Sequence, residues 1–192
     1  MYILFYMISA FKNYVGVGLL FYLVSHSGEK FSINELARKN NVAPRSAELF
    51  CKSFLEDGLL EKEVIGKSHL YYTNQENEQI KQLKKIVYPL ILLSKETDTF
   101  FSDFKPKILS VYLYGSCASG TYNSKSDLDL FVLSVNSLSA KETMKITDYI
   151  SSKIPEREIF PSIYSFEQYR KKIKNPFFVE VKKGVKIYGD LI

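Results

Sequence analysis

Residues 108–133 read ILSVYLYGSCASGTYNSKSDLDLFVL, and this stretch decides the fold of the C-terminal half of the chain. Its two ends are rich in residues that favour β-strands, so we expect two buried strands, over 108–114 and 127–134. Between them, Gly115 and Ser116 allow a tight turn that begins a short helix over 115–121. The stretch therefore predicts a strand, a turn with a helical segment, and a second strand.

The same stretch carries side chains suited to phosphate chemistry. Asp127 and Asp129 are two residues apart on a predicted strand, so both carboxylates leave the same face. The free N–H groups at Gly115 and Ser116 can hold a phosphate. Carboxylates next to a phosphate site are suited to Mg²⁺ on a nucleoside triphosphate.

Simpler roles are open for the same residues. Asp127 can cap a turn at the start of the strand, and Ser116 can cap the short helix. Asp129 is harder to explain in this way, because an acid inside an apolar run is costly unless it is paired or bound to a metal.

Composition limits the class of protein. The chain has 192 residues, 46% of them hydrophobic, and a net charge of +5, as expected for one medium or two small globular domains. This charge permits a nucleic-acid partner without requiring one. The two cysteines, Cys51 and Cys117, lie far apart, so we expect free thiols in a reducing compartment. The longest apolar run, residues 14–24, is shorter than the roughly 20 residues of a membrane span, and no signal-peptide pattern is present, so we expect a cytoplasmic protein.

Residues 1–75 are predicted to form a winged helix-turn-helix domain, with three helices followed by a β-hairpin. Ser32 and Glu35 form the capping-box pattern of a helix start, and Gly66 and Lys67 lie in the hairpin turn. The predicted elements are helices over 11–24, 33–39 and 44–57 and strands over 59–65 and 68–73.

This N-terminal segment resembles the winged-helix domains of archaeal and bacterial transcription regulators. The resemblance implies that Arg45, Ser46 and Lys52 of the third helix face a DNA groove, with Lys67 of the wing near phosphate. The same fold also serves in protein–protein contacts and dimerisation, and the acidic residue Glu48 beside these side chains favours that alternative.

Residues 76–106 are predicted to form a helical linker. Apolar residues recur there at helical spacing, and Pro89 is expected to kink or divide the helix. An apolar stripe of this kind packs against a domain or a second subunit, so a homodimer is one possibility.

Residues 107–192 complete an α+β chain, as a domain with a mixed sheet flanked by helices. After the quoted stretch, the pattern predicts a helix over 139–152, a strand over 157–164, a helix over 166–174 and a closing segment over 177–188.

The stretch YGSCASGTYNSKSDLDLFVL resembles the nucleotidyltransferase superfamily of DNA polymerase β, and within it the minimal nucleotidyltransferase (MNT) branch. The tail REIFPSIYSFEQYRKKIKNPFFVEVKKGVKIYG is similar to the end of a subfamily in which a winged helix precedes that domain. The resemblance implies that Asp127, Asp129 and Glu158 bind Mg²⁺, and that Gly115 and Ser116 hold the β- and γ-phosphates. For Glu158 there is an alternative, because the adjacent Arg157 could pair with a neighbouring acid.

The implied activity is transfer of a nucleoside monophosphate, most simply AMP from ATP, to a hydroxyl on a protein or nucleic acid. MNT relatives are antitoxins that modify a HEPN-type toxin on a tyrosine, and such a partner would be encoded separately. Ser119 stands where many MNT proteins have a basic residue, and Lys125 could replace that charge. This departure supports an alternative function, a DNA-binding transcription regulator whose nucleotidyltransferase-like domain senses a nucleotide without catalysis.

Overall fold

The computed structural model describes residues 14–190, and these residues form two compact units. One contains residues 14–87 together with 120–124, and the other contains residues 88–119 and 125–190. The predicted N-terminal helix begins at Phe11, so its first three residues lie outside the described residues. The predicted domain boundaries, after residues 75 and 106, stay predictions.

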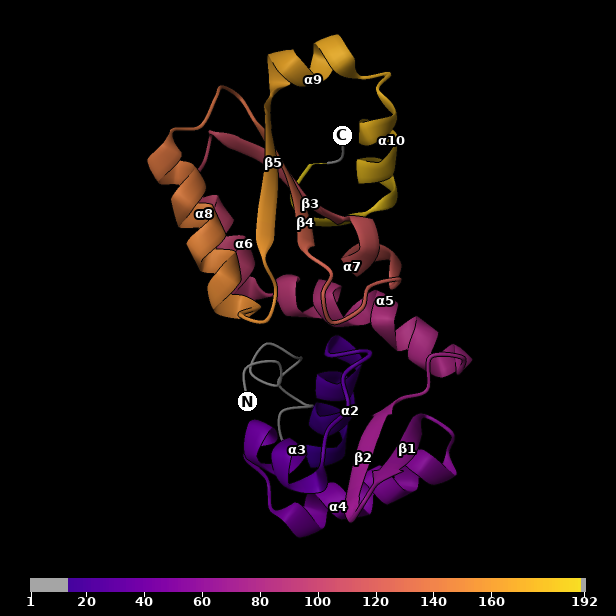
Figure 1. The fold of residues 1–192 in the computed structure, drawn as a ribbon. Helices are drawn as coiled ribbons and strands as arrows, with labels where there is room; N and C mark the ends of the chain where they lie inside the picture. The colour runs from indigo at the N-terminus through magenta and orange to yellow at the C-terminus, as the bar shows by residue number, and fades with distance from the viewer. Residues whose placement is uncertain (1–13, 191–192) are drawn as a thin grey trace. The chain divides into compact units, whose positions relative to one another are not determined.

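Within residues 14–75, three helices are followed by a β-hairpin, the order predicted from the sequence (Figure 1). The hairpin strands are antiparallel, and the turn between them contains Gly66 at φ +60°. The core is formed by buried apolar residues of all three helices. The elements are α2 (Val15–Ser25), α3 (Ile33–Asn40), α4 (Pro44–Glu56), β1 (Leu60–Ile65) and β2 (Ser68–Thr73).

Local sequence signals explain where these helices begin and end. The Ser32 side chain accepts a hydrogen bond from the backbone N–H of Glu35, which is one half of the predicted capping box. Asn41 follows α3 in the left-handed conformation, at φ 53°, and ends that helix. Pro44 is the first residue of α4, where its missing N–H costs no helical hydrogen bond.

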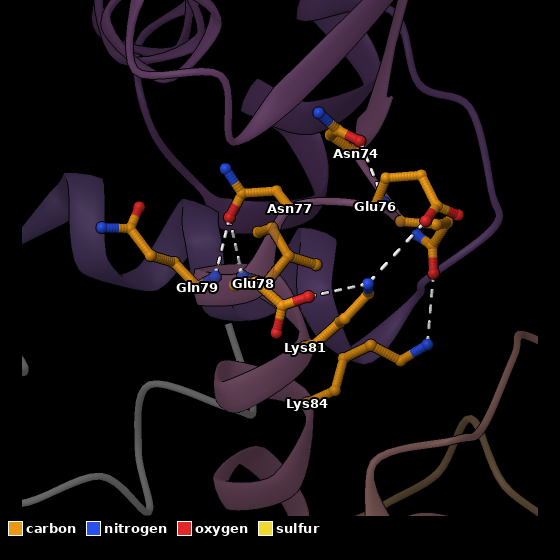
Figure 2. Close-up of polar contacts among 9 residues, drawn as sticks. Asn74, Glu76, Asn77, Glu78, Gln79, Lys81 and Lys84 are labelled. Atoms are coloured by element: carbon orange, nitrogen blue, oxygen red, sulfur yellow. Dashed lines mark hydrogen bonds and ion pairs between the residues drawn. The ribbon is translucent and has the colours of Figure 1, made fainter.

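The start of α5 (Glu78–Leu92) is fixed by short polar contacts, which Figure 2 shows. The Asn77 side-chain oxygen accepts hydrogen bonds from the backbone N–H groups of Gln79 (2.8 Å) and Ile80 (3.1 Å). Lys84 donates to the side-chain oxygen of Gln75, at 3.2 Å. The capping asparagine satisfies two N–H groups that a helix start otherwise leaves without partners.

Pro89 does not divide the linker helix, which was one of its two predicted effects. The other, a kink, stays a prediction. Helix α5 continues through Pro89 to Leu92, and the break comes at Ser94, whose side chain caps α6 (Lys95–Ser102). Pro89 lies in the last turn of α5 and removes only its own backbone donor from the helix. Much of the predicted apolar stripe is buried within the chain, including Ile80, Val87 and Leu92.

The second unit is built on a four-stranded mixed sheet with the strand order β5-β4-β3-β6. Only β4 and β5 are parallel, whereas β3 is antiparallel to both of its neighbours. The α+β fold class predicted from the sequence is thereby confirmed. The strands are β3 (Ile108–Tyr114), β4 (Leu128–Ser134), β5 (Ile159–Ser165) and β6 (Val185–Gly189).

Helices cover both faces of this sheet (Figure 1). On one face, Tyr112 and Phe131 pack with Tyr169 and Phe178 of α9 (Phe166–Lys172) and α10 (Pro176–Lys183). On the other face lie α6 and α8 (Ala140–Lys153), where the rings of Phe100 and Tyr149 stack with centroids 3.8 Å apart. Aromatic side chains packed on both faces contribute apolar area that helps to hold such a domain together.

Pro161 lies within β5, although its ring removes a backbone donor. The Leu128 N–H donates to the carbonyl of Glu158, the residue directly before β5. Backbone groups alternate in direction along a strand, so the even-numbered residues of β5 direct their N–H and C=O groups toward β4, and the odd-numbered residues direct theirs away from it. Pro161 therefore directs its nitrogen to the open edge of the sheet, where a missing N–H costs no ladder bond.

Candidate active site

The glycine turn and one predicted carboxylate lie against each other. β3 ends at Tyr114, which is paired in register with Asp129 of β4, and Gly115 follows at φ +68°. A Cβ atom at position 115 would meet the carboxylate of Asp129, whose Cγ would lie 3.1 Å away. Position 115 therefore needs glycine for its backbone conformation and for the space that the carboxylate occupies.

Helix α7 (Gly115–Ser119) begins at this turn. Ser116 is half-buried, whereas Ser119 is exposed and its hydroxyl donates to the Ser116 carbonyl at 3.3 Å. Cys117 is buried, and burial raises the pKa of its thiol to about 11. The thiol is therefore protonated at neutral pH and unsuited to act as a nucleophile.

The structure brings Asp127 and Asp129 together. Asp127 is exposed and directly precedes β4, and Asp129 is the half-buried second residue of that strand. Burial raises the pKa of Asp129, and the negative charge of Asp127 raises it further. A cation would stabilise the charge of Asp129 that burial and the neighbouring carboxylate disfavour.

Glu158 is placed differently. It is exposed, directly before β5, and its backbone carbonyl accepts the Leu128 N–H at 2.9 Å. It is not among the groups that shift the pKa of Asp129, and within residues 14–190 no three His, Cys, Asp or Glu side chains are gathered closely enough to hold a metal. The role of Glu158 as a third ligand stays a prediction.

Arg157 forms hydrogen bonds next to the carboxylate pair that were not predicted from the sequence. It is buried, and it donates from Nη1 to the Ser126 carbonyl (2.7 Å) and from Nε to the Tyr88 hydroxyl (2.6 Å). A hydroxyl and a carbonyl from distant segments leave no mark in the local pattern, so the sequence did not indicate these two partners. The pairing of Arg157 with a neighbouring acid stays a prediction.

The segment between α7 and β4 belongs in part to the N-terminal unit, which contains residues 120–124. Tyr122 is 1% exposed, and its hydroxyl donates to the Val24 carbonyl at 3.1 Å. The Nζ atom of Lys84 lies 4.9 Å from the centroid of the Tyr122 ring. Tyr122 is therefore a core residue of that unit, although polar residues follow it in the sequence. Lys125, the predicted substitute for the missing basic residue, is exposed.

The predicted DNA-contacting residues lie in the N-terminal unit. Arg45 and Lys67 line one shallow hollow of about 520 Å³, together with His69 and Glu48. The Arg45 side chain is 86% exposed and forms an ion pair with Glu48 at 2.9 Å. Ser46 and Lys52 are not among the residues that line the hollow, so the structure gathers only part of the predicted set.

A mixed sheet that presents two carboxylates beside a glycine turn is the arrangement predicted from the polymerase β resemblance. Residues 95–189 match the family described as "Polymerase beta, Nucleotidyltransferase". These residues are therefore a polymerase β-type nucleotidyltransferase domain, which confirms their resemblance to the DNA polymerase β superfamily. No curated protein matches the sequence.

Solved structures show only weak overall likeness. Two mutant forms of the toxin–antitoxin MntA–HpeT are each 18% identical, over 48% of this chain and 69% or 68% of theirs, with TM-scores of 0.36 and 0.34. Human N-acetylserotonin methyltransferase (ASMT) in complex with SAM is 16% identical, over 36% of this chain and 24% of its own, with a TM-score of 0.30. Across residues 14–190, no helix is long and apolar enough to cross a membrane.

Proposed function

We propose that residues 107–192 form a Mg²⁺-dependent nucleotidyltransferase that transfers a nucleoside monophosphate, most simply AMP from ATP, to a hydroxyl on a protein or nucleic acid. The observation that carries this proposal is the packing of the Asp129 carboxylate against Gly115, with Asp127 close enough to raise its pKa. This arrangement joins a candidate phosphate-binding turn to a pair of metal-binding oxygens.

The side chains present fit a magnesium ion. Mg²⁺ in nucleotide enzymes is held by one or two carboxylates together with substrate phosphates and water, so two aspartates are sufficient protein ligands. Asp127 and Asp129 would hold the ion, and Glu158 is the candidate for a third contact. When bound, Mg²⁺ would neutralise charge on the triphosphate and so lower the barrier to attack by a hydroxyl.

The other residues of the site would position the substrate. The backbone N–H groups of Gly115 and Ser116 and the Ser116 hydroxyl would hold the β- and γ-phosphates. Glu158 could orient or deprotonate the incoming hydroxyl. Because Cys117 is buried and protonated, direct in-line attack by the acceptor is favoured over a covalent enzyme intermediate.

Incubation with Mg²⁺, α-labelled ATP and a cell extract tests the activity. Label should appear on a protein or RNA of the extract, and both Asp127→Ala and Asp129→Ala should abolish its transfer. Asp148→Ala is the matched control, because it changes a carboxylate of α8 outside the site. Transfer that persists in both site variants would contradict the proposal, as would binding of ATP with no transfer to any component.

A DNA-binding regulator that senses the nucleotide without turnover is the second candidate function. It is favoured by the hollow of the N-terminal unit, where Arg45 and Lys67 lie together. Binding to duplex DNA should weaken as salt rises. The slope of the logarithm of the binding constant against the logarithm of the salt concentration should become less steep by about one phosphate contact in Arg45→Ala and in Lys67→Ala. Lys141→Ala, in the other unit, should leave this slope unchanged. A salt response that neither Arg45→Ala nor Lys67→Ala alters would exclude this surface as a DNA-binding site.

A further inference from the structure

We propose that Arg157 is a positioning residue that holds the backbone of residues 125–127, here called the Asp127 loop, in place for metal and nucleotide binding. This inference rests on the proposed function. Arg157 lies between α8 and β5 and is 6% exposed. Its guanidinium donates to the carbonyl of Ser126, the residue directly before Asp127, and to the hydroxyl of Tyr88 on α5. It also lies over the Tyr88 ring, 5.2 Å from the centroid.

Three consecutive residues at the start of β4 are held by hydrogen bonds. Ser126 accepts from Arg157, the Asp127 carbonyl accepts from the thiol of Cys117 at 3.3 Å, and the Leu128 N–H donates to the Glu158 carbonyl. The exposed side chain of Asp127 is thus attached to a fixed backbone. Among these three bonds, only that of Arg157 has a charged donor, and charge-assisted bonds are the stronger kind.

The Arg157 side chain is suited to this role by its shape. A guanidinium is planar and rigid, so it can donate to two acceptors from different segments and still stack on an aromatic ring. Tyr88 is fully buried, and burial raises the pKa of its hydroxyl, so the hydroxyl stays neutral and its oxygen can accept the bond from Nε. A lysine ammonium keeps the charge but has no planar fork.

The proposed action of Arg157 is positional, through the backbone before Asp127, and not a direct effect of its charge on Asp129. Arg157 is not among the groups that shift the pKa of Asp129, where only burial and Asp127 contribute. The hydrogen bonds to Ser126 and Tyr88 join its guanidinium to groups outside the carboxylate pair. The expected consequence of its loss is therefore a loop whose carboxylate no longer keeps one position relative to Asp129 and the Gly115 turn.

Amide hydrogen exchange by NMR tests the positional role without requiring activity. Exchange at the Leu128 amide reports opening of the loop, and exchange at the Leu130 amide, in the middle of β4, reports the sheet. In Arg157→Met, Leu128 should exchange about tenfold faster with Leu130 unchanged, because the Ser126 carbonyl loses the charged donor that Arg157 supplies. Arg157→Lys should lie between this variant and the wild type. Arg170→Met, which changes an exposed arginine of α9, should behave as the wild type.

Calorimetric titration with Mg²⁺ and ATP links this role to the site. The Kd for ATP should rise about tenfold in Arg157→Met, in parallel with the exchange rate, and recover in part in Arg157→Lys. If Arg157→Met does not fold, Tyr88→Phe is measured in its place. That variant keeps the ring and removes one acceptor, so a smaller increase in Leu128 exchange is expected.

Unchanged Leu128 exchange in a folded Arg157→Met protein, or in Tyr88→Phe where that replaces it, would overturn the proposal. Faster exchange with unaltered affinity for ATP would overturn it too, because the loop would then not matter for binding. A wild-type protein that binds no ATP refutes the proposed function. In that case, the exchange rates alone decide whether Arg157 holds the loop.

Discussion

Replacing Gly115 by alanine tests whether the glycine turn and the Asp129 carboxylate form one packed unit. An alanine at φ +68° pays the left-handed backbone penalty, roughly 1–2 kcal/mol. Its Cβ would also displace the Asp129 carboxylate, and overpacking of this kind costs about 1–3 kcal/mol. The free energy of unfolding should therefore fall by about 2–5 kcal/mol in Gly115→Ala.

Denaturant unfolding of a double-mutant cycle separates the two contributions. Asp129→Ala removes the carboxylate, so adding Gly115→Ala to it should cost only the backbone part, roughly 1–2 kcal/mol. Gly66→Ala is a matched control at φ +60°, with no atom within 4 Å of the added Cβ, and should cost the same backbone part. An equal cost for Gly115→Ala with and without the Asp129 carboxylate would refute the reasoning.

Three further predictions concern single side chains. Because the pKa of Asp129 is raised above its ordinary value of 3.8, the folded state favours its protonated form, and this contribution is lost as pH rises through the raised pKa. Asp129→Asn should therefore stabilise the protein at neutral pH by thermal unfolding, with a difference that disappears below about pH 3.8; no gain at neutral pH would contradict it. Ser119→Arg should tighten ATP binding about two- to fivefold in calorimetry, the value of one exposed charge contact, and unchanged affinity would exclude a phosphate contact there. Tyr122→Phe should lower the free energy of unfolding by about 1–2 kcal/mol in denaturant, because the buried Val24 carbonyl loses a donor, whereas the exposed Tyr14→Phe should change it by less than about 0.5 kcal/mol.

Local patterns allowed much of the fold to be predicted. The strands around the glycine turn were predictable because β-forming residues surround a position where only glycine suits a positive φ. The helices of the N-terminal unit were predictable from the cap at Ser32 and the proline at position 44. The closeness of Asp127 and Asp129 followed from the two-residue period of a strand.

Other features depend on contacts between distant segments, which no local pattern records. Helix α5 continues through Pro89 and ends at Leu92. The local sequence did not indicate that the break would come after the proline, at Ser94. The burial of Tyr122 depends on its packing with residues nearly one hundred positions earlier. Arg157 bonds to a carbonyl and a tyrosine hydroxyl, and carbonyl acceptors occur at every residue, so the sequence could not identify its partner.

Calorimetric titration of ATP into the protein, with Mg²⁺ and then with EDTA, tests the central claim most directly. If Asp127 and Asp129 hold the ion that binds the triphosphate, ATP should bind with Mg²⁺, and EDTA, Asp127→Asn and Asp129→Asn should each weaken that binding at least about tenfold, the expected scale for losing a charged ligand contact. Equal ATP affinity with Mg²⁺ and with EDTA, unaltered in both variants, would contradict the account.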